Sequence, residues 1–257
     1  MRYVMSLSGG VASAVAAERA IARHGREAVT LWFADTGWED EDLHRFLADC
    51  LARWGGALVT VTEGRTPLEV AEDEHVFPTQ RLAPCSSRLK VRPFRRWLAD
   101  QPRPLTVLLG LDWRERHRMA GPRAAYATDG LAVDFPLDWR PLEYRPYVEV
   151  VAGWGIAPPR LYALGFPHNN CGGRCVRQGI AEWQRLKRHF PERFAEVRDW
   201  EAAQRAKGAP WSGRAFARDR SGGEVRPRTL AEIERMAEPP EGQLTMDDQF
   251  ACFCQDA

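Results

Sequence analysis

The sequence predicts an α/β protein built on a doubly wound parallel sheet of five strands. Short apolar runs alternate with segments of helical composition along the first half of the chain. Glycine-rich or charged residues gather where these runs end. In doubly wound sheets, ligands bind at the carboxyl ends of the strands, so these residues form the candidate site. The expected strands cover residues 3–7, 28–34, 57–62, 104–110 and 132–135.

A loop with the sequence SGGVAS, residues 8–13, joins the first strand to the first helix. Unsatisfied backbone N–H groups and the helix dipole at such a junction favour an anion. Gly9 and Gly10 let the backbone come close to a ligand, and Ser8 and Ser13 add hydroxyl donors. The loop therefore predicts a phosphate cradle. The alternative is a tight strand-to-helix turn with no ligand.

Polar residues also follow the second strand, which ends at Asp35-Thr36-Gly37. An acidic residue at this position of a βαβ unit is well placed to meet a nucleotide. The alternative is that Asp35 or Thr36 caps the helix expected from about residue 39 to residue 53, and the two roles are compatible.

A basic segment follows residues 64–87, which we expect to form a long irregular connection. A helix is expected from there through about residue 100. Such a basic run can receive phosphates, or it can be a solvated helix face. Between residues 81 and 103 the chain has one acidic residue and seven basic ones: Arg81, Arg88, Lys90, Arg92, Arg95, Arg96 and Arg103.

Charged residues, 111–118, gather directly after the fourth expected strand. The composition changes further along the chain, at about residue 141. Thr229 and Glu232 have the spacing of a capping box, and the glycines near residue 222 indicate a hairpin turn. Helices are expected near residues 144–153, 176–189, 191–207 and 229–236. We therefore expect an α/β nucleotide-binding domain at 1–140 and a mainly helical, cysteine-containing module at 141–257.

The composition indicates a cytoplasmic protein with no membrane partner. A formal charge of +1 excludes a strongly basic nucleic-acid binder but leaves room for local basic patches. No apolar run reaches the length of a membrane-spanning helix. The chain starts like a strand and not like a secretion signal, so the six cysteines are expected to be reduced, metal-binding or catalytic.

Four of the cysteines predict a metal site, because they fall into two closely spaced pairs. Together they supply four thiolates, which is enough for a tetrahedral Zn²⁺ site, and His168 offers a substitute ligand. The first cysteine pair is Cys171 and Cys175, and the second cysteine pair is Cys252 and Cys254.

Two alternatives to the zinc site stay open. A [4Fe-4S] cluster could be held by Cys85, Cys171 and Cys175, which would leave a cysteine of the second pair as a mobile nucleophile. The second alternative is that the thiols carry no metal. Cys50, flanked by apolar residues of a helix, is expected in the core.

Four segments carry a family resemblance. SGGVAS at residues 8–13 resembles the SGGxxS pyrophosphate loop of the PP-loop, or adenine-nucleotide alpha-hydrolase, superfamily. DTGWE at 35–39 and CSSRLKVRP at 85–93 resemble the TGxE and Cys…Lys-Val-x-Pro elements of its phosphoadenosine phosphosulfate (PAPS) reductase-like branch. LYALGF at 161–166, running into the first cysteine pair, is similar to the LYxxGY…GC..C stretch. The resemblance implies a Rossmann-like HUP/PP-loop sheet.

The chain also differs from that family. Ala12 stands where ATP-cleaving PP-loops carry the acidic residue of SGGxDS, a position linked to Mg²⁺. The chain ends with Cys-Phe-Cys near its terminus and lacks the Glu-Cys-Gly-(Ile/Leu)-His tail of sulfonucleotide reductases. Ser86 follows Cys85 where the iron–sulfur reductases have a second cysteine, and three residues separate the first cysteine pair where they have two.

The resemblance implies an enzyme that binds ATP or a PAPS-type nucleotide, with Mg²⁺ as a further candidate cofactor. The first hypothesis is ATP-dependent adenylation at the α-phosphate coupled to sulfur or nitrogen transfer. The second is a thiol-dependent PAPS or adenylyl-sulfate reductase that releases sulfite. The third is a nucleotide- or nucleic-acid-binding module without hydrolysis. Candidate partners are an acceptor, either a small molecule or a nucleic acid, and a second copy of the chain.

The candidate site residues follow from the loop, the strand ends and the matched segments. The candidate catalytic residues are Cys85, Arg88 and Lys90. The candidate nucleotide-binding residues are Ser6, Ser8, Gly9, Gly10, Ser13, Asp35, Thr36, Gly110 and Arg118.

Overall fold

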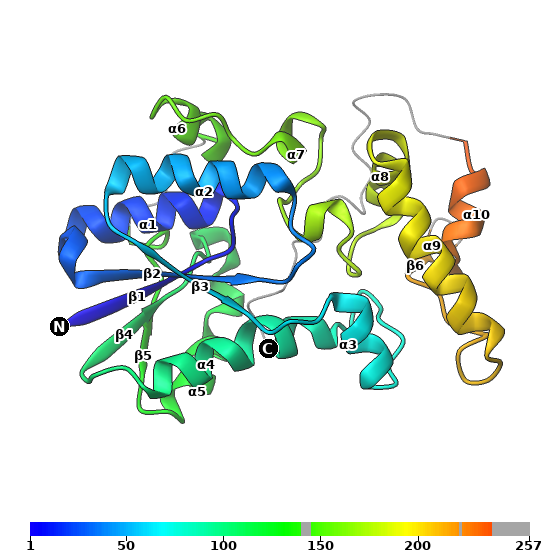
Figure 1. Ribbon diagram of the computed structural model, residues 1–257, viewed down its shortest axis with the longest axis horizontal. Coiled ribbons are helices and arrows are strands. Elements are labelled where there is room, and N and C mark those ends of the chain that lie inside the picture. The colour runs from blue at the N-terminus through cyan, green and yellow to red at the C-terminus, as the bar shows by residue number, and fades with distance from the viewer. Residues whose placement is uncertain (140–144, 221–222, 238–257) are drawn as a thin grey trace. The chain divides into compact units, whose positions relative to one another are not determined.

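The computed structural model describes residues 1–139, 145–220 and 223–237 (Figure 1). These residues form two compact units. The first unit comprises Met1–Gly64 and Ser86–Arg160, and the second comprises Arg65–Cys85 and the described residues from 161 to 237. Within these ranges no helix is long and apolar enough to cross a lipid bilayer. The functional domains at 1–140 and 141–257 stay predictions.

The first unit contains a five-stranded parallel sheet with the strand order β3-β2-β1-β4-β5. The predicted doubly wound parallel sheet is confirmed. Met5 of the central strand pairs with Leu31 on one side and with Leu108 on the other. Because both faces of the sheet are covered, the central strands are mostly apolar. The strands are β1 (Arg2–Leu7), β2 (Val29–Asp35), β3 (Leu58–Thr62), β4 (Leu105–Leu108) and β5 (Ala132–Asp134).

Helices cover both faces of this sheet. Figure 1 shows α1 (Val11–His24) and α2 (Glu41–Trp54) on one face, and α4 (Arg92–Ala99) and α5 (Ala120–Ala127) on the other. Four shorter elements complete the unit: the 3₁₀ turns η1 (Arg26–Ala28) and η3 (Trp113–Arg118), the π-helical turn η2 (Ser86–Val91) and helix α6 (Tyr147–Ala152). Helix α7 (Arg160–Ala163) begins at the last residue of the unit.

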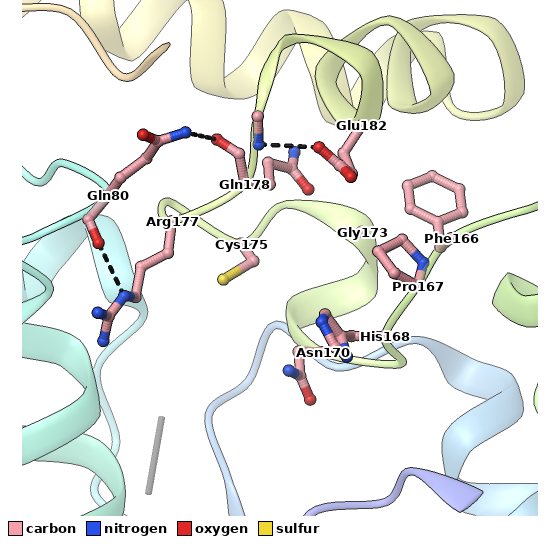
Figure 2. A pocket seen from close by; sticks show the side chains of 11 residues that line it. Gln80, Phe166, Pro167, His168, Asn170, Gly173, Cys175, Arg177, Gln178 and Glu182 are labelled. Atoms are coloured by element: carbon pink, nitrogen blue, oxygen red, sulfur yellow. Dashed lines mark hydrogen bonds between the residues drawn. The ribbon is translucent and has the colours of Figure 1, made fainter. Parts of the chain in front are cut away.

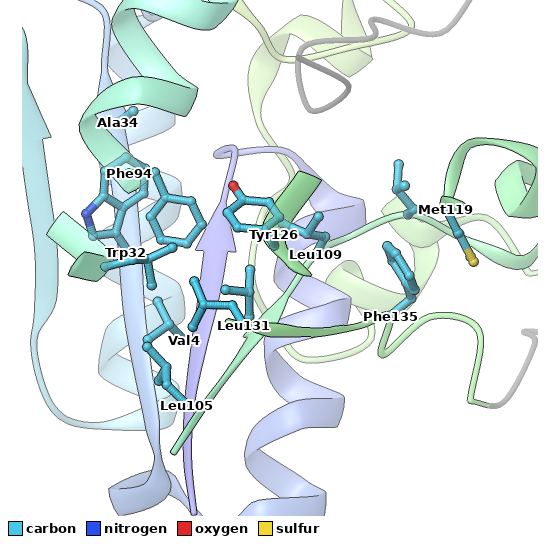
Figure 3. Packing of buried hydrophobic residues seen from close by; sticks show 13 residues of the cluster. Val4, Trp32, Ala34, Phe94, Leu105, Leu109, Met119, Tyr126, Leu131 and Phe135 are labelled. Carbon is cyan, nitrogen blue, oxygen red and sulfur yellow. The ribbon is translucent and has the colours of Figure 1, made fainter. Parts of the chain in front are cut away.

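An aromatic cluster packs α4 and α5 against the sheet (Figure 3). The Trp32 and Phe94 ring centroids are 4.5 Å apart, and the Phe94 and Tyr126 rings meet edge to face at 6.2 Å. Burial raises the pKa of the Tyr126 hydroxyl to about 12. On the other face of the sheet, Cys50 of α2 is completely buried as predicted, and burial likewise raises its pKa to about 12.

Two local predictions for the first half of the chain are wrong. Residues 64–87 are not irregular throughout, because α3 (Pro67–Asp73) forms within them. Thr66 and Glu69 make a complete capping box ahead of it, with proline at the first turn. The cap of α2 is neither Asp35 nor Thr36: Asp40 accepts a hydrogen bond from the Asp42 N–H at 3.0 Å.

The second unit is mainly helical around an aromatic centre. Besides α3 it contains α8 (Ile180–His189), α9 (Pro191–Ala206), α10 (Leu230–Arg235), and the 3₁₀ turn η4 (Cys171–Gly173). Strands β6 (Ala217–Asp219) and β7 (Arg226–Arg228) confirm the predicted hairpin, although turn residues 221–222 lie outside the described residues. The predicted helix at 176–189 begins four residues late, where Glu182 completes a capping arrangement at Gly179.

A buried carboxylate fastens the hairpin and α10 to α9. Glu201 is 1% exposed, and its two oxygens accept backbone N–H groups of Phe216 at 2.9 Å and Leu230 at 2.5 Å. Burial raises the pKa of Glu201 to about 7, although these hydrogen bonds oppose the increase. The folded state therefore holds this proton at pH values where the unfolded chain has lost it.

We expect this carboxyl to make the second unit less stable as the pH rises from about 5 to about 8, by about 3 kcal/mol. The sign follows because a carboxyl with a raised folded-state pKa stabilises the fold below its unfolded pKa and loses that contribution as the pH passes the folded value. Urea unfolding of the full chain at both pH values measures this change in the free energy of unfolding. The Glu201→Gln variant should lose this pH dependence, whereas Glu224→Gln, at an exposed hairpin position, should keep it. An unchanged pH dependence in Glu201→Gln would contradict the assignment.

Candidate nucleotide-binding site

The SGGVAS loop is held in shape by its own serines. The Ser13 hydroxyl accepts hydrogen bonds from the Ser8 N–H at 3.2 Å and from the Ser8 hydroxyl at 3.1 Å, and it donates to the Gly10 carbonyl at 2.8 Å. Gly10 is the N-cap residue of α1, with extended backbone. The loop is therefore fixed before any ligand binds, and its N–H groups lie at the start of a helix whose first turn has no acidic residue.

Two glycines fit places where a side chain would collide. Gly9 has a φ of +76°, and a Cβ atom built on it would lie 2.4 Å from Cδ1 of Leu43 on α2. At Gly110, after β4, an added Cβ would lie 3.2 Å from the Cα of Ser13. Gly9 is needed for its positive φ, and both glycines are needed because neighbouring atoms come too close for a side chain.

The loop lies at the switch point of the sheet. From β1 the chain continues to β2 and β3 on one side, and it later returns to β4 and β5 on the other. The carboxyl ends of β1, β2 and β4 therefore meet at one edge, where doubly wound folds bind ligands. This edge brings together the predicted loop, Asp35 with Thr36, and Gly110. Ser6, also a candidate, lies within β1 opposite Trp32 and is half-buried.

Asp35 and Thr36 differ in what they can offer a ligand. One Asp35 oxygen accepts the Gly37 N–H at 2.9 Å, and the other lies 3.8 Å from Nε2 of His44. Thr36 is 2% exposed, and its hydroxyl donates to Glu39 at 2.9 Å. Asp35 remains partly exposed at the strand end, whereas the Thr36 side chain supports Glu39.

A buried ion pair connects two of the segments that carry the family resemblance. The ammonium nitrogen of Lys90 lies 3.6 Å from Oε1 of Glu39, the same oxygen that Thr36 contacts. The Glu39 side chain is 1% exposed and that of Lys90 18%. The pair joins the turn after β2 to the π-helical turn η2, which also carries the half-buried Arg88. Such π-helical turns occur frequently at functional sites. The role of Glu39 was missed, although the DTGWE match contains it.

The basic segment is not one solvated face. Arg95 pairs with Asp129 at 2.6 Å, and this hydrogen bond raises the pKa of the guanidinium. Lys90 faces Glu39 within the unit. The boundary between the units falls after Cys85, so Arg81 and Cys85 belong to the second unit and the other basic residues to the first. Only part of the segment therefore remains available to an anion in the first unit.

Asp112 and Arg118 organise the turn after β4. Asp112 caps η3 in a box with Glu115, and Arg118 is paired with Glu115 and nearly buried. The Tyr147 hydroxyl donates to Asp112 at 3.1 Å. Burial opposes ionisation of Asp112, but the hydrogen bonds and charge of Arg114 outweigh it and hold the pKa of the carboxyl below its usual value. The Asp-x-x-Glu spacing of this box is a signal that sequence reasoning passed over.

Cys175 of the first cysteine pair borders a pocket of the second unit. Figure 2 shows Cys175 among the lining side chains, which include Phe166, His168, Asn170 and Gln178. Its wall is closed by hydrogen bonds from the Gln80 amide to the Gln178 carbonyl at 3.3 Å and from Arg177 to the Gln80 carbonyl at 2.9 Å. The predicted ligand His168 thus lies at the same pocket as Cys175.

The four-cysteine site is only half described. Cys171 is buried in the 3₁₀ turn η4, with a left-handed φ of 52°, and Gly172 and Gly173 continue the turn with positive φ. Cys252 and Cys254 lie outside the described residues. Among the residues that are described, no three His, Cys, Asp or Glu side chains are close enough to hold a metal ion. The metal assignment stays a prediction.

Comparisons with known proteins find similarity among solved structures and in neither of the other two searches. No protein-family model and no curated protein matches the sequence. Among solved structures, the chain is similar to a phosphoadenylyl-sulfate (PAPS) reductase from Candida auris in a phosphate complex. The TM-score is 0.45 and the identity 16%, over 65% of this chain and 79% of that chain. At this identity the similarity concerns the fold alone.

The structure therefore assembles most of the predicted nucleotide-binding residues in the first unit. The loop, the β2 turn and the β4 turn belong to one edge of the sheet, with Lys90 joined to the β2 turn through Glu39. Cys85 and the first cysteine pair belong to the second unit.

Proposed function

We propose that the first unit binds an adenine nucleotide with its phosphates on the SGGVAS loop, and that the chain is a PP-loop enzyme of the PAPS reductase-like kind acting at the α-phosphate. The observation that carries this proposal is the loop itself. It is fixed by Ser13, opened by Gly9, and set at the N-terminus of a 14-residue helix at the switch point of the sheet. That combination favours a phosphate both by hydrogen bonding and by the helix dipole.

The remaining roles follow from charge and position. Asp35, partly exposed at the end of β2, is suited to hydroxyl groups of the ribose. Arg88 and Lys90 are the cations of the η2 turn, and we assign them to the charge that develops on the phosphates, with Lys90 held in position by Glu39. Because Ala12 removes the usual acidic side chain, any Mg²⁺ would depend on the phosphates and on other oxygen ligands. Cys85 stays a proposed catalytic residue.

In the proposed reaction, an oxygen of the acceptor attacks the α-phosphorus of ATP. The bond from that phosphorus to the bridging oxygen breaks, and pyrophosphate leaves with the electron pair. Donors of the loop would stabilise the charge on the leaving group. A sulfur or nitrogen nucleophile then displaces AMP from the adenylated acceptor. The acceptor itself, a small molecule or a nucleic acid, is a further part of the proposal.

Product analysis with the full chain tests this function. ATP, PAPS and adenylyl sulfate are offered separately, and pyrophosphate, AMP, ADP and sulfite are measured. We expect tight ATP binding and, with water as a slow acceptor, AMP and pyrophosphate without ADP. The Ser13→Ala variant should bind ATP more weakly, whereas Ser212→Ala, at an exposed position of the second unit, should not. Sulfite from PAPS would favour the reductase instead, and binding without turnover would favour a non-catalytic module.

We also propose that the two cysteine pairs bind a metal, either Zn²⁺ or an iron–sulfur cluster. The buried Cys171 in its glycine turn is the expected anchor. Metal and acid-labile sulfide are measured on protein purified without oxygen. Replacing Cys171 with serine should release most of the metal, whereas Cys50→Ala, which removes a core thiol, should leave the metal content unchanged. Equal metal content in the wild type and the Cys171→Ser variant would exclude this site. Sulfide that matches the iron would identify a cluster.

A further inference from the structure

A second pocket of the second unit combines an aromatic wall with unopposed positive charge. Phe77, Leu82 and Trp211 contribute its apolar surface, and His75, Arg214 and Arg218 stand around it. Phe77 is buried and lies 5.9 Å from the Trp211 ring, whereas Leu82 is 52% exposed. No acidic side chain lines the pocket. We call this the Trp211 pocket.

Local hydrogen bonds fix the walls of the Trp211 pocket. Thr79 and Leu82 exchange two backbone hydrogen bonds, at 2.8 and 3.1 Å, and so close a tight turn. On the Trp211 side of the pocket, the Trp211 backbone N–H donates to the Gly208 carbonyl at 2.9 Å, and the Arg214 carbonyl accepts from the Arg205 guanidinium. The aromatic and apolar side chains are thus held in place on a preformed surface and need little ordering when a ligand binds.

The arginines of the pocket are available to a ligand. Neither Arg214 nor Arg218 uses its guanidinium in a hydrogen bond or ion pair with any described residue. Among the acidic residues that precede His75, Glu72 and Asp73 are engaged with partners that do not line the pocket. Glu72 accepts from Trp200 at 2.7 Å and from Gln204 at 2.9 Å, and Asp73 pairs with Arg65 at 2.8 Å.

The positive charge extends beyond the pocket along the chain. Residues 205–228 contain seven basic residues and two acidic ones, although the whole protein is nearly neutral. Arg220 and Arg226 of the β6–β7 hairpin are exposed, and the Arg226 side chain is 70% exposed. A lone mononucleotide would use only the pocket. A longer polyanion would use the hairpin as well.

We propose that the Trp211 pocket and the β6–β7 hairpin bind single-stranded nucleic acid. One base would stack against Trp211, and the flanking phosphates would meet Arg214 and Arg218. Stacking on aromatic side chains beside a basic groove is how single strands are bound without base-pair readout. A duplex keeps its bases inside the helix and could use only the arginines. This inference does not depend on adenine-nucleotide binding at the SGGVAS loop.

Fluorescence anisotropy of the full chain with labelled oligothymidylate and oligouridylate of about 12 nucleotides tests the proposal. Neither oligomer carries adenine, so neither reports on the proposed adenine-nucleotide site. We expect single strands to bind at least about tenfold more tightly than the duplex of the same length and than thymidine or uridine monophosphate. Trp211→Ala should weaken binding by about tenfold and Trp211→Phe by less.

The arginines are tested through the salt dependence of binding. Arg214→Ala combined with Arg218→Ala should reduce the slope of log affinity against log salt by about 1.4, that is, about 0.7 for each phosphate contact. Arg214→Lys should keep most of the affinity, and Arg235→Ala, an exposed arginine of α10 that does not line the pocket, should change neither quantity. Urea midpoints confirm that each variant is folded. Three results would each overturn the proposal. The first is equal affinity for the duplex and the single strand, and the second is equal affinity for the mononucleotide and the single strand. The third is that the folded Trp211 and arginine variants bind the single strand as tightly as the wild type does.

Discussion

Replacing Gly9 with alanine is expected to abolish adenine-nucleotide binding and to destabilise the first unit. The new Cβ would sit 2.4 Å from Leu43, a residue with no exposed surface, at a φ of +76° that L-residues rarely adopt. Either the loop leaves its conformation or Leu43 moves out of the core. The combined strain and overpacking should cost about 2–5 kcal/mol of unfolding free energy. Isothermal titration with ATP and urea unfolding measure the two effects.

Gly121→Ala is the matched control for this substitution. Gly121 is exposed on α5, its backbone has no positive φ, and an added Cβ meets nothing within 4 Å. We expect normal ATP binding and equal or slightly greater stability, because alanine is the better helix former. If Gly9→Ala bound ATP as tightly as the wild type does, the loop would not be the phosphate site.

Replacing Lys90 with methionine is expected to lower the unfolding free energy by about 3 kcal/mol. The substitution removes the charge that faces the Glu39 carboxylate, which is 1% exposed. A buried charge without its partner costs far more than the intact pair contributes. Glu39→Gln keeps an oxygen for the Thr36 hydroxyl and should be less damaging than Glu39→Ala. Urea unfolding of the single and double variants separates these effects.

The double variant, Glu39→Gln with Lys90→Met, should recover much of the loss, because neither buried charge remains. The more exposed pair Arg95–Asp129 of the same unit serves as the control. Its members are 37% and 32% exposed, and Asp129→Asn should cost less than about 1 kcal/mol. Strictly additive losses for Glu39 and Lys90 would show that the ion pair does not couple them.

The sequence by itself determined the class of fold and the position of the loop. Apolar runs such as residues 3–7 and 104–110 predict buried strands of a covered parallel sheet, since they lack the alternation of half-exposed strands. The glycines and serines of SGGVAS are local signals, because a positive φ and a helix N-terminus depend on neighbouring residues alone. Local signals were also present for α3 and η3, in the Thr66–Glu69 and Asp112–Glu115 capping boxes, and were overlooked.

Only the tertiary structure decided which distant residues meet. Nothing in the separate segments shows that Lys90 faces Glu39, that Gly9 packs on Leu43, or that Trp211 shares a pocket with Phe77. It also decided that Arg95 of the basic segment is neutralised by Asp129. These contacts join residues far apart in the chain, and burial and charge pairing depend on the packed arrangement of several elements at once. Spacing along the sequence contains no information about such partners, because each is chosen by the fold as a whole.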